Sequence, residues 1–426
     1  MKLKPGKDAE KPEAYRPITV LSNLSKVFER LLLDFLKPHI EPRSEQFAYR
    51  SGHTPTLQLT RVLHCLASCW NNQKCSVMVL LDIKKAFDSV WHDGLLYKLS
   101  KKAVPRRALR VVANFLQNRK FLVTVQGRDS SVRGASAGVP QGGCFSPALY
   151  CMFTDDIPVY NGVLLALYAD DTAYHCSSVT ADNAIQMMQA QLDALPAWLD
   201  KWRLSVNVAK TQAMIIGPKQ NVYEPLKLHG QDITWSRTVR YLGLTIDQDL
   251  TMRDHVQKKI EDAEIALNEL GPVLDGSSPL TIYNKNIRSK LMYAAPAWYA
   301  LTAEPERERL RAQETLCLRT INGAGKSHRD LQYEGLDAYV VRAAQQMFES
   351  AENSVYLHIR DIAPLHARSF DASSRALPRE LLGPTTTVAP TTTPAAAGAP
   401  RSGELRPSQF PGSECHTAGP LTVIAG

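Results

Sequence analysis

Short apolar runs and one polar turn predict a β-sheet in the first half of the chain. Residues 77–81 (VMVLL) form a β-branched and aliphatic run that is short enough to be a buried strand. A second apolar run, residues 162–167, is followed by Tyr168-Ala169-Asp170-Asp171 and then by the β-prone residues 172–175. Two strand-like segments around a short turn are typical of a β-hairpin, so we expect two adjacent carboxylates at a hairpin tip.

Longer segments with helical character surround these strands. We expect helices at residues 24–40, 105–118, 181–203, 253–270 and 280–300, and a further hairpin around residues 240–246. A glycine-rich loop, residues 138–143, leads into a helix that starts near Ser146-Pro147, because proline suits a first helical position after a serine cap. This mixture of strands and helices predicts an α+β fold.

A third carboxylate joins the pair at the hairpin tip. Asp82 directly follows the strand predicted at residues 77–81, so its side chain is directed out of the sheet. Two strands that lie side by side would gather Asp82, Asp170 and Asp171. Crowded like charges need a cation, and these oxygen ligands suit two Mg²⁺ ions roughly 3.5–4 Å apart, as in phosphoryl transfer. On its own, an Asp-Asp pair at a turn is more often a solvated turn.

Basic side chains favour a polyanionic partner. The formal net charge is +8, and no acidic residue lies between Asp93 and Asp129. The basic residues of this interval are Lys98, Lys101, Lys102, Arg106, Arg107, Arg110, Arg119, Lys120 and Arg128. Such one-signed clustering is typical of phosphate binding and predicts strongly salt-dependent affinity, with a solvated helix face as the alternative.

Composition and cysteine spacing set further bounds. A chain of 426 residues, 44% of them hydrophobic, can bury a sizeable core in more than one domain. The densest cysteine group, His64, Cys65, Cys69 and Cys75, has poor zinc-finger spacing, so reduced thiols in an intracellular protein are the simpler interpretation. We expect no membrane association, because no apolar stretch is long enough to span a bilayer and the first residues open no signal peptide.

Several short motifs follow one another along the chain in a fixed order. They are residues 81–90 (LDIKKAFDSV), 138–142 (GVPQG) with Ser146-Pro147, 168–171 (YADD), Asn207 with Lys210-Thr211, and 241–243 (YLG), preceded by 4–7 (KPGK), 15–18 (YRPI) and 46–50 (QFAYR). In order and spacing these motifs resemble the reverse transcriptases of non-LTR retrotransposons, and most of all the insect jockey-like group. The resemblance covers roughly residues 1 to 360.

The resemblance implies a catalytic role for the acids. Asp82, Asp170 and Asp171, with the main chain of Ile83, would hold two Mg²⁺ ions, or Mn²⁺ in their place. Lys210 resembles the lysine that protonates the leaving pyrophosphate in this family. For Asp88, a structural role as a cap or hydrogen-bond acceptor is favoured over metal binding.

The resemblance also implies nucleotide contacts. Phe87 would pack under the incoming sugar and exclude a 2′-hydroxyl, while the main chain near Ile83 touches the triphosphate. Gln141 would contact the template and the base, and Arg16 and Lys26 would bind the triphosphate oxygens. Gly143 stands where the family usually has serine, which predicts a mild loss of order or activity.

The fold implied by the resemblance is a right-hand polymerase with a disordered tail. Its parts would be partial fingers (1–75), a ferredoxin-like palm with the catalytic acids (76–225), a primer grip and helical thumb (226–330), a helical post-thumb segment (331–375) and a tail rich in Pro, Thr and Ala (376–426).

The function expected from the resemblance is RNA-directed DNA polymerisation. The partners would be an RNA template, a DNA primer or target and dNTPs, met in the nucleus and cytoplasm; the sequence does not indicate an oligomeric state. Two alternatives stay open. One is a truncated or co-opted RNA-binding relic that no longer copies RNA, and the other is a maturase similar to those of group II introns.

Overall fold

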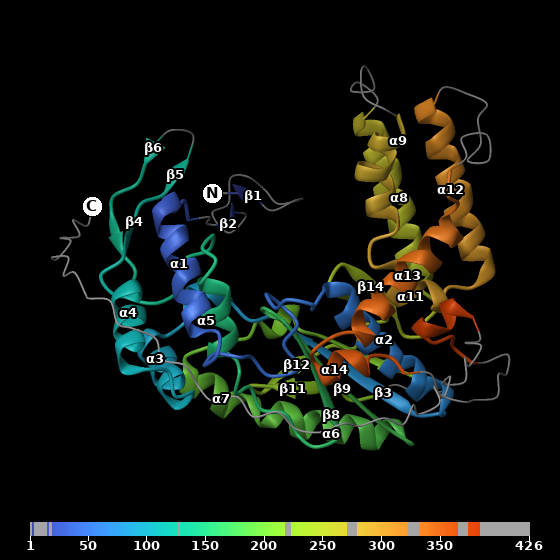
Figure 1. Cartoon of the computed structure of the whole chain (residues 1–426). Helices are drawn as coiled ribbons and strands as arrows, with labels where there is room; N and C mark the ends of the chain where they lie inside the picture. Colours follow the sequence, from blue (N-terminus) through green and yellow to red (C-terminus); the bar gives the residue numbers. More distant parts are fainter. Residues whose placement is uncertain are drawn as a thin grey trace, which may run out of the picture. The chain divides into compact units, whose positions relative to one another are not determined.

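A four-stranded antiparallel sheet organises the computed structural model (Figure 1). Its strands are β3 (Cys75–Leu81), β8 (Val163–Tyr168), β9 (Asp171–Ser178) and β10 (Gln212–Ile216), in the order β10-β3-β9-β8. Strands β8 and β9 form the hairpin that the sequence predicts, and β3 pairs with β9 along its whole length. The strand and the hairpin predicted from the apolar runs are therefore confirmed.

The structure describes residues 2–3, 15–16, 19–125, 128–217, 223–270, 279–322, 333–364 and 374–383. Residues 1–384 form one unit, and a second unit, residues 385–426, lies outside the described residues. Within the described ranges, no helix combines the length and the apolarity needed to cross a membrane.

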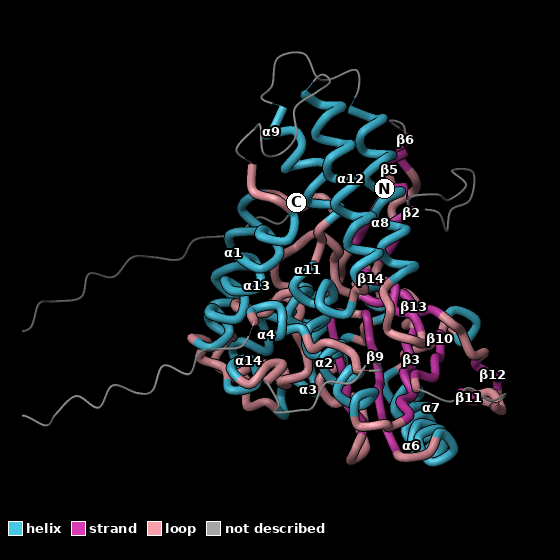
Figure 2. Tube along the Cα trace, turned by 90° about the vertical axis from the view of Figure 1, so that its right-hand side faces the viewer, coloured by secondary structure: helices cyan, strands magenta, loops and turns pink. Residues whose placement is uncertain are grey.

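Side chains of the sheet alternate between two hydrophobic cores. From β3, Val77 and Val79 enter one core together with α6 (Ala181–Asp193), whereas Met78 enters the other together with α2 (Pro55–Asn71). Because successive residues of a strand point to opposite faces, a strand that is buried on both faces needs an unbroken apolar run. Figure 2 shows β3 and β9 side by side in this sheet.

Helices and short hairpins surround the sheet in the first 210 residues. They are β1 (Lys2–Leu3), β2 (Tyr15–Arg16), α1 (Asn23–Leu36), a 3₁₀ helix (Ala86–Ser89), α3 (His92–Lys101), α4 (Arg106–Leu116), β4 (Lys120–Phe121), β5 (Thr124–Val125), β6 (Arg128–Asp129), β7 (Arg133–Gly134), α5 (Ser146–Phe153), α7 (Leu195–Trp202) and a 3₁₀ helix (Val208–Lys210). The predicted helices at 24–40 and 105–118 are confirmed with shorter bounds. Helix α1 ends before Pro38, which cannot continue a helix.

Small hairpins and a set of helices follow the sheet. They are β11 (Leu226–Leu228), β12 (Gln231–Ile233), β13 (Thr238–Tyr241), β14 (Leu244–Asp247), α8 (Arg253–Leu270), α9 (Pro279–Ile282), a π-helix (Tyr283–Arg288), α10 (Ser289–Leu291), α11 (Ala295–Trp298), a 3₁₀ helix (Tyr299–Leu301), α12 (Glu304–Asn322), α13 (Leu336–Glu352), α14 (Leu357–Arg360) and a 3₁₀ helix (Pro378–Leu382). The hairpin expected around residues 240–246 and the helix at 253–270 are confirmed.

Three secondary-structure predictions are wrong. The helix predicted at 181–203 breaks between α6 and α7, where Pro196 stands in the first turn of α7. The helix predicted at 280–300 is a series of short helical pieces, interrupted at Ala294, whose φ of 55° is left-handed. Residues 376–383, predicted to be disordered, include a 3₁₀ helix and the buried Leu377, because leucines there supply apolar surface. Residues 384–426 of the predicted tail lie outside the described residues.

Candidate active site at the end of strands β3 and β9

The turn between β8 and β9 carries two of the predicted catalytic acids. Tyr168 and Asp171 form the last pair of the hairpin, so Ala169 and Asp170 make its tip. Both aspartates are exposed. Ala169 has a φ of 58°, a left-handed conformation that is unfavourable for alanine and must be maintained by surrounding contacts.

Two buried glutamines hold this turn. Gln46 is 1% exposed, and its Oε1 accepts the N–H groups of Ala169 and Ala48, both at 3.0 Å. Gln58 is fully buried and donates from Nε2 to the carbonyl of Leu167 at 3.1 Å. The position of the acids therefore depends on polar side chains that the sequence analysis did not assign. The only signal was the QFAYR motif, which contains Gln46.

Asp82 reaches the same end of the sheet from β3. The last pair between β3 and β9 is Leu81 with Thr172, so the antiparallel register, continued by one residue, sets Asp82 opposite Asp171. Asp82 is half-buried. The structure therefore brings Asp82, Asp170 and Asp171 to one end of the sheet, from a strand end and a turn that are far apart in the sequence.

Main-chain hydrogen bonds fix the segment that follows Asp82. The N–H of Asn207 donates to the Asp82 carbonyl, and the N–H of Lys84 donates to the Ser205 carbonyl, each at 2.8 Å. Because these two bonds lie on either side of Ile83, Ile83 and Val206 form an antiparallel pair of the kind that has no hydrogen bonds of its own. In such a pair the main-chain groups point away from the partner strand, so the Ile83 carbonyl points away from residues 205–207. The Ile83 carbonyl, which the resemblance implies as a metal ligand, is therefore not used in the pairing with residues 205–207.

The donor set at this strand end fits a hard cation. Three carboxylates and a main-chain carbonyl are the oxygen ligands that Mg²⁺ prefers. Within the described residues, the oxygens of Asp82, Asp170 and Asp171 do not all lie within 4.8 Å of one another.

Tyrosine hydroxyls surround the acids and stay protonated. Burial, followed by the charges of Asp170 and Asp171, raises the pKa of Tyr150 well above its usual value. Burial and the charge of Asp171 likewise raise the pKa of Tyr241. The acids therefore have neutral phenols among their neighbours.

Phe87 packs on Tyr150, one of the tyrosines near Asp170. Its ring stacks on the buried ring of Tyr150 in α5, with centroids 4.7 Å apart and an interplanar angle of 20°. Gly138 has a φ of 89°, and a Cβ there would lie 2.8 Å from the carbonyl oxygen of Asp88, so only glycine allows this close approach. Gln141 donates from Nε2 to Asp88 Oδ1 at 3.1 Å. Asp88 thus accepts a structural hydrogen bond, the role favoured from the sequence.

For the predicted basic residues, the structure gives main-chain contacts rather than contacts of the charged side chains. Lys210 is exposed, and its N–H donates at 3.0 Å to the carbonyl of Asn207, the residue bonded to the main chain of Asp82. Lys26 is exposed on α1, and its carbonyl accepts the thiol of Cys144, next to the glycine-rich loop, at 3.7 Å. The side chain of Arg16 lies outside the described residues.

Glu29 of α1 explains why Gly143 is accommodated. Glu29 is fully buried, and its Oε2 accepts the N–H of Phe145 at 3.1 Å, immediately before α5 begins. A Cβ at position 143 would overlap this carboxylate. A carboxylate is stabilising at a helix N-terminus, so Glu29 orders the loop that the sequence predicts to be looser. The predicted effect of Gly143 on activity stays a prediction.

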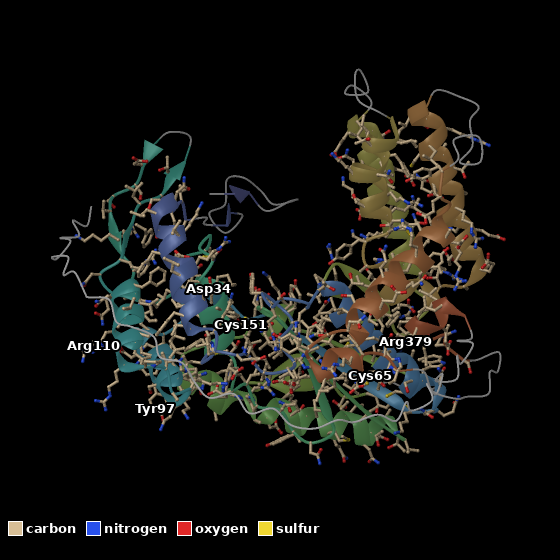
Figure 3. The ribbon with its side chains drawn as sticks, viewed as in Figure 1. Asp34, Cys65, Tyr97, Arg110, Cys151 and Arg379 are labelled. Carbon is tan, nitrogen blue, oxygen red and sulfur yellow. The ribbon has the colours of Figure 1, made fainter. Side chains whose placement is uncertain are left out.

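The basic interval is only partly available to a polyanion. Lys98 is buried, donates to Asp156 Oδ1 at 2.5 Å, and has its pKa lowered by burial to about 8. Lys102 pairs with Asp155 at 2.6 Å. The exposed basic residues of the interval include Lys101, Arg106, Arg107, Arg110 (labelled in Figure 3) and Lys120. The expectation that Lys98 belongs to a phosphate-binding surface is therefore wrong.

Comparison with known proteins identifies the class of this site. The family model described as "Reverse transcriptase (RNA-dependent DNA polymerase)" matches residues 3–246, which include all the acids above. The chain belongs to the reverse transcriptase family.

Similar proteins include polymerases of insect mobile elements. The chain is 32% identical over 366 residues to the probable RNA-directed DNA polymerase from transposon BS of Drosophila melanogaster, covering 80% of this chain and 40% of that protein. It is 32% identical over 341 residues to the RNA-directed DNA polymerase from mobile element jockey of Drosophila funebris, covering 76% of this chain and 37% of that protein. The resemblance to the jockey-like group is confirmed, and the chain spans about 40% of the length of such relatives.

Solved structures are more distant. The structure of apo telomerase from Candida tropicalis shares 13% identity, with a TM-score of 0.36, over 80% of this chain and 59% of that one. The α+β class and the right-hand polymerase fold follow from the family match and from the mixed sheet and helices described above.

Proposed function

We propose that the chain is the RNA-directed DNA polymerase module of a non-LTR retrotransposon. It extends a primer 3′-hydroxyl with dNTPs along an RNA template. The observation that carries the proposal is the register that sets Asp82 opposite Asp171 beside Asp170, within the region that the family model matches. Names of the relatives support the same activity.

The acids and one carbonyl provide the catalytic centre in this proposal. Asp82, Asp170, Asp171 and the Ile83 carbonyl hold two Mg²⁺ ions, or Mn²⁺ in their place. When bound, the ions stabilise negative charge on the attacking and leaving oxygens. The primer 3′-hydroxyl loses its proton to water, and its oxygen forms a bond to the α-phosphorus of the dNTP while the bond from that phosphorus to the pyrophosphate oxygen breaks. Lys210 donates a proton to the pyrophosphate.

Neighbouring residues select and hold the nucleotide. Phe87 lies under the sugar and excludes a 2′-hydroxyl, and its stacking on Tyr150 supports this role because the stack restricts the ring. Gln141 contacts the template and the base, and its hydrogen bond to Asp88 orients it. Arg16 and Lys26 bind the triphosphate in the same proposal.

The parts of the chain correspond to a polymerase hand in this proposal. Residues 76–225 form the palm, preceded by partial fingers in residues 1–75 and followed by a primer grip and thumb in residues 226–330. Helix α2 is an exception that we assign to the palm, since it covers one face of the sheet. Residues 331–375 form the post-thumb segment.

In the same proposal, the chain meets its RNA template, its DNA primer or target and its dNTPs in the nucleus and cytoplasm.

Primer extension tests this function. The reaction uses poly(rA)/oligo(dT), dTTP and Mg²⁺ with the wild-type chain, Asp170→Asn and, as a matched control, Asp200→Asn on an exposed position of α7. We expect extension by the wild type and the control and none by Asp170→Asn. Extension by Asp170→Asn at the wild-type rate would refute the assignment. Silence in all three, with RNA still bound, would show a binding relic instead.

A further inference from the structure

Two thiols and an imidazole meet on the face of the sheet covered by α2. Cys65, labelled in Figure 3, and Cys69 stand one turn apart on this helix, so both side chains lie on the same side of it. His175 and Ser177 alternate on β9 and point to the same face as each other. Cys65 Sγ lies 3.5 Å from His175 Nδ1, and Cys69 Sγ lies 3.2 Å from Ser177 Oγ.

The spacing of these atoms suits one metal ion. Ligand atoms of Cys65, Cys69 and His175 all lie within 4.8 Å of one another, and they form the one such group of three among the described residues. Zinc binds thiolate sulfur at about 2.3 Å and imidazole nitrogen at about 2.0 Å in a tetrahedron, which puts neighbouring ligand atoms roughly 3.5 Å apart. The observed separation of Cys65 Sγ and His175 Nδ1 already has this value.

The imidazole is buried and the two cysteines are half-buried. His175 is 3% exposed, and its Nε2 is buried with no hydrogen-bond partner in the described part of the chain. The other ring nitrogen, Nδ1, is directed at the cysteines. Cys65 and Cys69 are half-buried.

We propose that Cys65, Cys69 and His175 form a binding site for a thiophilic divalent cation, with zinc as the ion. Sulfur ligands disfavour Mg²⁺ and Ca²⁺, which take oxygen, so this site is chemically distinct from the acids at the strand end. Three protein ligands leave the fourth position to a water molecule. The ion joins α2 to β9, the strand that begins at Asp171, and it therefore stabilises the sheet that carries the acids. This role goes beyond the proposed polymerase activity.

Cobalt substitution tests the site without any activity measurement. The full chain is reduced with a phosphine, freed of metal and titrated with Co²⁺, which shows thiolate charge-transfer absorption in the near ultraviolet and visible d–d bands when it is tetrahedral. We expect one equivalent of Co²⁺ to give both signals and Zn²⁺ to abolish them. Cys69→Ser and Cys65→Ser should lose the charge-transfer band by at least half.

Matched variants separate this site from other thiols and from the acids. Cys144→Ser removes a half-buried thiol outside the cluster, and Asp170→Asn removes a carboxylate ligand of the strand end, so both should keep the full band. Circular dichroism checks that each variant is folded, and the second cysteine variant serves if the first does not fold. No thiolate band in the reduced wild type, or an undiminished band in folded Cys69→Ser, overturns the proposal. A Cys65–Cys69 disulfide on air oxidation, combined with no band in the reduced chain, also overturns it.

Discussion

Strand β9 carries residues of two clusters of potential metal ligands, one made of carboxylate oxygens and one made of sulfur and nitrogen atoms. At its start, Asp171 joins Asp82 and Asp170 in an exposed or half-buried set of hard oxygen ligands. Four residues on, His175 joins two thiols in a soft sulfur and nitrogen set on the α2 face. The first set is open, as a site that admits substrate must be, and the second is packed between a helix and a strand. One strand can thus carry a catalytic and a structural cation site, kept apart by ligand chemistry.

Removing an acid ligand should have the largest effect. We expect Asp82→Asn to lower the rate of nucleotide addition by about 10²–10³-fold or more, because a ligand that positions charge stabilisation in the transition state is lost. RNA binding should remain, since Asp82 carries no positive charge for phosphate. Single-turnover extension and filter binding measure the two quantities. A similar loss in the Asp200→Asn control would break the contrast between acids at the strand end and acids elsewhere.

Truncating the ring that packs on Tyr150 should have the next largest effect. Phe87→Ala is expected to lower the preference for dTTP over UTP, as a ratio of kcat/KM values, by about 10–200-fold, the range set by lost packing contacts in a pocket. Tyr150→Phe is the matched control, because it keeps the stacked ring and removes a buried hydroxyl with no partner in the described residues. An unchanged preference in Phe87→Ala would remove Phe87 from the site.

Loosening the turn that carries the acids tests whether buried polar contacts position them. Gln46→Met removes the acceptor of the Ala169 and Ala48 N–H groups and should lower the free energy of unfolding by about 1–3 kcal/mol. Extension should fall along with it, because Asp170 follows Ala169. Gln186→Met, at an exposed position of α6, is the matched control and should keep the wild-type stability in urea unfolding. Equal stability of Gln46→Met and wild type would contradict the role of Gln46.

Low pH should lower the free energy of unfolding of the chain. This effect limits the pH range in which the two proposed metal sites can be compared. His255 is fully buried, accepts the N–H of Thr245 at 3.3 Å and packs edge-on against Trp298. Burial, followed by the charge of Lys259, lowers the pKa of His255 to about 3. The folded chain therefore holds this ring neutral, while the unfolded chain binds a proton below a pKa of about 6.5.

The sign of this effect is fixed by that difference. The contribution of His255 is fully present above about pH 6.5 and is lost as the pH falls toward 3, by up to about 1.4 kcal/mol per pH unit. Urea unfolding at several pH values measures the slope, and His255→Leu should show a flatter one. The same slope in both chains would contradict the assignment. Thiols also bind protons at low pH, so metal binding by Cys65, Cys69 and His175 must be measured above about pH 6.5.

The three acids could be predicted from the sequence because short patterns of neighbouring residues mark them. An unbroken apolar run ending in Asp82 and a hairpin ending in Asp170 predict strand ends, and pairing of the two strands brings the acids together. The turn supports were not accessible, since Gln46 and Gln58 act through tertiary contacts with residues near 167–169. The break between α6 and α7 was also missed, because a proline in a first helical turn looks the same as one that interrupts a longer helix.

The thiol cluster shows the opposite case. Sequence spacing grouped Cys65 and Cys69 with His64 and Cys75 and gave no metal geometry. In the structure the third member of the cluster is His175, which is 110 residues from Cys65 in the sequence. Only the packing of α2 on β9 determines that partner, and no periodicity in either segment indicates it.

Asp170→Asn with two readouts tests the assignment of the acids and the independence of the two sites in one experiment. Asp170→Asn is assayed in a single preparation for Mg²⁺-dependent extension of oligo(dT) on poly(rA) and for the thiolate band with Co²⁺. The account predicts that extension falls by about 10²–10³-fold or more while the band stays at its wild-type intensity. Extension near the wild-type rate would contradict the assignment of the acids, and loss of both signals would contradict the independence of the two sites on β9.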